Sequence, residues 1–148
     1  MLFRSVLIID DSTSDARAVG ALLRGAFGRD VQVRHATSLL RARNMLLERV
    51  PELIILDDIL PPRDRAETSI AALREARFAG SIVVVSGGLT RIRTQALRAA
   101  GATGVIHKDD LNTTELAAAV YGVSAQPASG SSEQSRIKTL GEIDDELN

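Results

Sequence analysis

Five polar side chains of this chain each follow a short run of apolar residues. Asp10 and Asp11 come after the first run, Asp57 ends another, and Ser86 and Lys108 end two more. If the fold brings these side chains together, the three carboxylates will repel one another and need a cation. Oxygen ligands with room for water suit Mg²⁺. An aspartate can form an aspartyl phosphate, while a lysine and a metal ion neutralise phosphoryl oxygens. The residue types therefore indicate phosphoryl transfer to a carboxylate.

The apolar runs are short and rich in Val and Ile, which predicts β-strands rather than helices. They cover residues 5–10, 30–36, 52–57, 81–86 and 104–108. The first, third and fourth runs are continuously apolar, as expected of strands buried on both faces of a parallel sheet. The second alternates between apolar and polar residues, which suits an edge strand.

Amphipathic segments after these runs predict five helices. Ser12 and Asp15 form a capping-box-like pattern before the first helix, and Asn112 with Glu115 opens the fifth. The others cover about residues 39–50, 66–78 and 90–100. This alternation predicts an α/β fold, a doubly wound, flavodoxin-like (βα)5 parallel sheet with strand order 2-1-3-4-5. Ligands of such sheets bind beyond the carboxyl ends of the strands, where the five polar side chains fall.

The chain resembles the response-regulator receiver family of two-component signalling over roughly residues 5–123. The motifs that carry the resemblance are Asp10-Asp11, the run LDDILP at 56–61, Ser86-Gly87 and Lys108. The resemblance implies that Asp57 is the phosphoacceptor. It also implies that Mg²⁺ is held by Asp10, Asp11, Asp57 and the backbone carbonyl of Ile59. Ser86 would be the switch hydroxyl, Lys108 would pair with the phosphoryl group, and Gly87 would leave that group room.

This resemblance implies a phosphorylation-dependent signalling switch rather than an enzyme. A histidine kinase or a phosphotransfer protein would supply the phosphoryl group, and a face that binds an unidentified downstream protein would change. We expect a monomer or a weak, phosphorylation-dependent dimer. The net charge of -1 disfavours direct nucleic-acid binding, and no apolar run near the start is long enough to span a membrane. The chain contains no cysteine, which suits a reducing cytoplasm.

Several positions depart from the family pattern or carry no assigned role. Val105 stands where the family usually has Tyr or Phe, and Arg65 stands where it usually has Gly. We expect Asp58 to point away from Asp57 as a loop or surface residue. We expect the arginines of the fourth helix, at positions 91, 93 and 98, to form a solvated face.

The predicted organisation is a receiver domain at residues 1–123, followed by a flexible linker and a short acidic amphipathic tail at 124–148. We expect a stand-alone receiver without an output domain.

Two alternative functions remain open. In a phosphohydrolase of the haloacid-dehalogenase type Asp10 would be the nucleophile, but Ser12 stands where that family has a second Asp and Asp57 would lack a role. A pseudo-receiver would be an interaction module with a decayed site, which the intact acids and Lys108 argue against.

Overall fold

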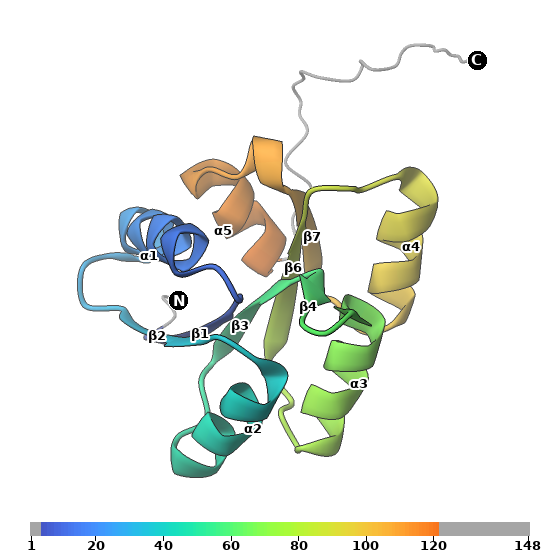
Figure 1. Ribbon diagram of the computed structural model, residues 1–148. Coiled ribbons are helices and arrows are strands. Elements are labelled where there is room, and N and C mark those ends of the chain that lie inside the picture. Colours follow the sequence, from blue (N-terminus) through green and yellow to red (C-terminus); the bar gives the residue numbers. More distant parts are fainter. Residues whose placement is uncertain (1–3, 122–148) are drawn as a thin grey trace, which may run out of the picture.

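The computed structural model describes residues 4–121 and shows a five-stranded parallel sheet with helices on both faces (Figure 1). The strands of the sheet are β1 (Ser5–Ile9), β2 (Gln32–Ala36), β3 (Leu53–Asp57), β6 (Ser81–Ser86) and β7 (Gly104–His107). Their order is β2-β1-β3-β6-β7, and every neighbouring pair is parallel. This is the predicted order 2-1-3-4-5, so the fold prediction is confirmed. A two-residue hairpin of β4 (Ile59–Leu60) and β5 (Asp64–Arg65) was not predicted.

Two groups of helices cover the two faces of the sheet. On one face lie α1 (Thr13–Phe27) and α5 (Thr113–Tyr121). On the other lie α2 (Leu39–Glu48), α3 (Ala66–Glu75) and α4 (Arg91–Ala99). A short 3-10 helix, η1 (Lys108–Asp110), leads from β7 towards α5. No helix within residues 4–121 is long and apolar enough to cross a membrane.

The central strands bury both of their faces, as their continuous apolar character predicts. Alternate residues of β3 face opposite cores: Ile54 and Leu56 pack with α2, α3 and α4, whereas Leu53 and Ile55 pack with α1 and α5. In β6, Val84 faces the first of these cores and Val85 the second. This alternation decides the direction in which each polar residue at a strand end points.

Side-chain caps fix where the helices begin. The Ser12 Oγ accepts a hydrogen bond from the backbone N–H of Asp15 at 3.2 Å, and the Asn112 Oδ1 accepts one from Glu115 at 2.8 Å. Both caps occur where the sequence pattern predicts them. The predicted linker and tail at 124–148, and the boundary at residue 123, lie outside the described residues.

Candidate functional site

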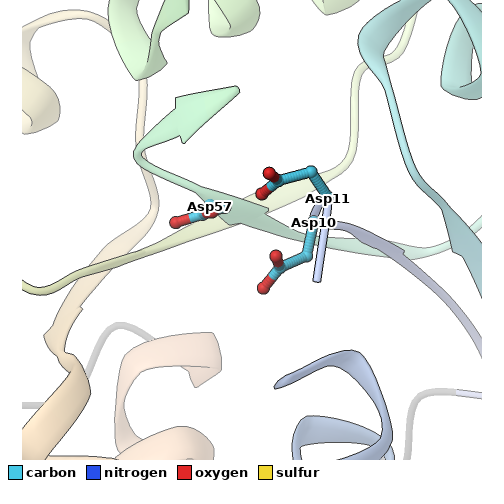
Figure 2. A group of neighbouring side chains, drawn as sticks. All are labelled: Asp10, Asp11 and Asp57. Atoms are coloured by element: carbon cyan, nitrogen blue, oxygen red, sulfur yellow. The ribbon is translucent and has the colours of Figure 1, made fainter. Parts of the chain in front are cut away.

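Three carboxylates meet at the carboxyl edge of the sheet. Ile9 of β1 pairs with Leu56 of β3, so the residues that follow this pair, Asp10 and Asp57, lie side by side. Asp10, Asp11 and Asp57 each offer an oxygen, and these oxygens lie within 4.8 Å of one another. Figure 2 shows Asp10 and Asp11 extending from the segment after β1, beside Asp57 at the end of β3. The sequence prediction that these three residues form one cluster is confirmed.

The cluster confines negative charge in a partly buried place. Burial, with the charge of Asp10 and then that of Asp11, raises the pKa of Asp57 to about 6, although the charge of Lys108 opposes this rise. Burial also raises the pKa of Asp10, although its Oδ1 accepts a hydrogen bond from the Ser12 N–H at 2.8 Å. Carboxylates that resist ionisation in this way are stabilised by a bound cation. The all-oxygen donor set therefore fits a divalent ion such as Mg²⁺.

Lys108 lies beside the cluster, directly after β7, as the first residue of η1. Its Nζ is 3.7 Å from Oδ1 of Asp57 and 3.8 Å from Oδ2 of Asp15 in the first turn of α1. A cavity with a volume of about 300 Å³ opens here, and Asp10, Asp15, Asp57 and Lys108 are among its lining residues. The sequence pattern assigned Asp15 only to helix capping. Its place in the first turn, one turn beyond the Asp pair, was the available signal that it faces this edge.

The glycines after β6 leave space near the cluster. A Cβ atom at Gly87 would lie 3.8 Å from Cδ of Lys108, and one at Gly88 would meet nothing within 4 Å. Ile59 follows Asp57 by two residues and is 52% exposed. The role of its carbonyl as a metal ligand stays a prediction.

Ser86 is buried, and its hydroxyl donates a 2.7 Å hydrogen bond to Oδ2 of Asp58 rather than to Asp57. Strand alternation explains this choice. Ser86 follows Val85 and so faces the same side of the sheet as Val84, the side of α3 and α4. Asp58 likewise faces the side of Leu56, whereas Asp57 faces the side of Ile55 and α1.

Asp58 lies in the bend between β3 and β4, which agrees with the expectation of a loop residue, but it is not a surface residue, since its exposed fraction is 5%. It does point away from Asp57, but that direction leads under α4 rather than into solvent. The expectation that Arg93 belongs to a solvated face is also wrong, because its side chain points into the protein and is only 11% exposed. Its guanidinium forms ion pairs with Asp58 and with Glu67 of α3. Arg91 and Arg98 are exposed, as expected.

The ion pairs keep Asp58 charged inside the protein. Burial alone would raise its pKa, but hydrogen bonds from Arg93 and Ser86 lower it below the ordinary value. A buried carboxylate needs such a partner, because an isolated charge in an apolar interior is strongly unfavourable. The signal for this pair was in the sequence: an acid at the inward-facing position after β3, and an arginine in the first turn of the helix that covers it.

Solved structures with similar folds are response-regulator receiver domains. The signal receiver domain of a putative LuxO repressor protein from Vibrio parahaemolyticus has a TM-score of 0.69 and 22% identity, over 81% of this chain and 88% of that one. A response regulator from Burkholderia pseudomallei, solved with a phosphorylated aspartic acid, calcium ion and citrate, has a TM-score of 0.65 and 26% identity, over 79% and 66%. The chemotaxis response regulator CheY4 of Vibrio cholerae has a TM-score of 0.65 and 24% identity, over 78% and 93%.

No protein-family model matches the chain, and no curated protein matches its sequence. The structural likeness nevertheless covers most of the described residues. The chain therefore has the fold of response-regulator receiver domains, as its sequence motifs predicted.

Proposed function

We propose that this protein is a phosphorylation-dependent signalling switch that accepts a phosphoryl group on Asp57, with Mg²⁺ bound beside it. The observation that carries the proposal is the cluster itself: three carboxylate oxygens within 4.8 Å of one another, with the Lys108 ammonium 3.7 Å from Asp57. A structural ion pair would need only one of these acids. Three acids and one lysine at the carboxyl edge of a parallel sheet suit a site for a cation and a phosphoryl group.

The phosphoryl donor would be a phosphohistidine of a histidine kinase or of a phosphotransfer protein. One oxygen of the ionised Asp57 carboxylate attacks the phosphorus and forms the new P–O bond. The P–N bond breaks, its electron pair stays on the imidazole nitrogen, and the ring then takes up a proton. With a pKa of about 6, Asp57 is mostly ionised at neutral pH and can act as this nucleophile.

Asp10, Asp11, Asp57 and the Ile59 carbonyl would hold Mg²⁺, which when bound neutralises phosphoryl oxygens and lowers the repulsion among the acids. Lys108 would pair with a phosphoryl oxygen from the other side, since its flexible stem lets the ammonium follow the new charge. Gly87, which has no side chain, would leave room for the phosphoryl group.

The phosphohydrolase alternative is less well supported by the geometry. It requires Asp10 as nucleophile, but Asp10 is 6% exposed and accepts a hydrogen bond from the Ser12 N–H. Ser12, where that mechanism needs an acid, caps α1. Under our proposal the only chemistry is the transfer of the phosphoryl group to Asp57 and the later hydrolysis of the aspartyl phosphate, which releases inorganic phosphate. The proposed donors act in the cytoplasm, where we expect this chain to act on a downstream protein.

Intact-mass measurement after incubation with a small acyl phosphate and Mg²⁺ distinguishes the three functions. The switch predicts retained addition of one phosphoryl group, lost in Asp57→Asn and kept in the control Asp30→Asn, which changes an exposed acid elsewhere. Release of inorganic phosphate without a retained label would support the phosphohydrolase. An absence of any reaction would support the pseudo-receiver.

A further inference from the structure

A network of polar side chains connects the hydroxyl of Ser86 to helix α4. The Ser86 Oγ donates to Oδ2 of Asp58 at 2.7 Å, and the same Asp58 carboxylate binds the guanidinium of Arg93 in the first turn of α4. Arg93 also binds Glu67 in the first turn of α3. Four residues therefore connect the end of β6, the end of β3, α3 and α4.

This network is buried and well defined. The side chains of Asp58 and Arg93 are 8% and 11% exposed, respectively. The backbone of Asp58 is also hydrogen-bonded to β6, since its N–H donates to the Val85 carbonyl at 3.1 Å. On the other side, the Gly88 N–H donates to the Ser86 Oγ at 3.2 Å. The hydroxyl thus accepts one hydrogen bond and gives its only proton to Asp58.

Two acceptors would compete for the hydroxyl proton of Ser86. Under the proposed function, a phosphoryl group on Asp57 would add oxygens on the other side of the strand end. A serine hydroxyl has one proton, so Ser86 can donate either to the Asp58 carboxylate or to a phosphoryl oxygen, but not to both. A hydrogen bond to a charged acceptor is among the stronger ones, so the existing bond holds the hydroxyl firmly.

We propose that Asp58 is a positioning residue that holds the Ser86 hydroxyl away from Asp57 and, through Arg93, couples the position of that hydroxyl to helix α4. When Ser86 turns to a phosphoryl oxygen, Asp58 loses one of its donors and its contact with Arg93 must readjust. The movement of one proton donor is thereby transmitted to α4 and, through Glu67, to α3. This inference rests on the proposed function, because it needs the phosphoryl group.

The neighbouring strand β7 contains no Tyr or Phe that could provide this coupling. Val105 of β7 packs against the core on the α3 and α4 side and has no polar group. The path from Ser86 to α4 through Asp58 and Arg93 consists instead of hydrogen bonds and ion pairs whose partners can change.

A paired replacement tests the inference without leaving a buried charge unpaired. Asp58→Leu combined with Arg93→Met removes both members of the ion pair, and such replacements by apolar residues of similar size are generally tolerated. Glu67, whose side chain is 39% exposed, can then be solvated. The probe is beryllofluoride with Mg²⁺, a stable analogue of the phosphoryl group, and the measurement is its dissociation constant from NMR titration. The matched control is Arg91→Met, an exposed arginine in the same turn of α4.

We expect the paired variant to bind beryllofluoride on the order of tenfold more tightly than the parent, because Ser86 no longer has to leave a charged acceptor. In a Ser86→Ala background the same replacement should bring no gain, since the competing hydroxyl is gone. The amide resonance of Gly88, which reports the Ser86 oxygen directly, should shift in the paired variant even without beryllofluoride. The Arg91→Met control should match the parent throughout.

Equal or weaker binding by a folded paired variant would overturn the inference, and so would a gain that persists in the Ser86→Ala background. The single variant Asp58→Asn provides a second measurement if the pair does not fold. It keeps the shape but removes the charge, and it should tighten binding several-fold, whereas unchanged affinity would count against the inference. A parent protein that binds no beryllofluoride would instead refute the proposed function itself.

Discussion

Removing the charge of Asp57 should stabilise the protein when no divalent cation is present. Burial and the neighbouring acids raise its pKa from 3.8 to about 6, a difference of about two units. Each unit corresponds to about 1.4 kcal/mol, so the ionised form is disfavoured in the fold by at most about 3 kcal/mol. The Asp57 side chain is 11% exposed and solvent screens part of the repulsion, so we expect Asp57→Asn to gain about 1–2 kcal/mol.

The dependence on pH follows from the direction of the shift. The folded protein binds the Asp57 proton more tightly than the unfolded chain does, so the parent loses stability as the pH rises from about 4 to about 6. Below that window both states are protonated, and above it both are ionised and the penalty is constant. The stability difference between Asp57→Asn and the parent should therefore be small near pH 4, grow up to about pH 6, and stay level beyond.

Urea unfolding in EDTA at several pH values measures this difference, with Asp30→Asn as the exposed control. For a domain of this size a gain of 1–2 kcal/mol corresponds to roughly 3–10 °C in the midpoint of thermal unfolding. Adding Mg²⁺ at pH 7.5 should stabilise the parent more than the variant, because the ion binds the charge that the variant lacks. A variant no more stable than the parent in EDTA at pH 7.5, or a gain that is the same at every pH, would refute the reasoning.

Three further predictions concern the same site. Asp11→Ala should lower Mg²⁺ affinity on the order of tenfold and slow phosphorylation, and an unchanged affinity by isothermal titration would exclude Asp11 as a ligand. Lys108→Ala should weaken the response of α4 to phosphorylation, and Lys108→Arg should not restore it because a planar guanidinium differs from a compact ammonium. If hydrogen exchange of the α4 amides responds to phosphorylation as fully as in the parent, that role is wrong. The phosphoryl group should be long-lived, since neither the apolar Ile59 nor Gly88 can orient water. Ile59→Asn with Gly88→Glu should therefore speed the decay of the label, and an equal rate would show that these positions do not set its lifetime.

The fold and the acid cluster could be predicted because local sequence determines both. Continuous runs of Val and Ile define strands that are buried on both faces. In a parallel sheet the carboxyl-terminal ends of all the strands lie at the same edge. Asp10, Asp11, Asp57 and Lys108 therefore had to lie near one another once the strand order was right. The caps at Ser12 and Asn112 are similarly local, since each needs only a side chain three residues from an N–H group.

The partners of Ser86 and Arg93 could not be predicted in the same way. They depend on how α4 lies over the end of β3, and hydrophobic periodicity does not determine the position of a helix to within a hydrogen bond. Asp58 and Arg93 are 35 residues apart in the chain, and Arg93 alone of the three arginines of α4 turns inward. Strand alternation did indicate that Asp58 points away from Asp57. It did not indicate that α4 covers this side of the strand end, or that the guanidinium of Arg93 lies there.

The most direct test of the central claim is to locate the phosphoryl group by peptide mass analysis after labelling with an acyl phosphate. We predict that the label lies on Asp57, that it forms with Mg²⁺ present, and that it is absent in EDTA. A label on Asp10 or Asp11, or one that forms on Asp57 equally well without a divalent cation, would contradict the claim that these three acids form a phosphoacceptor site that depends on a metal ion.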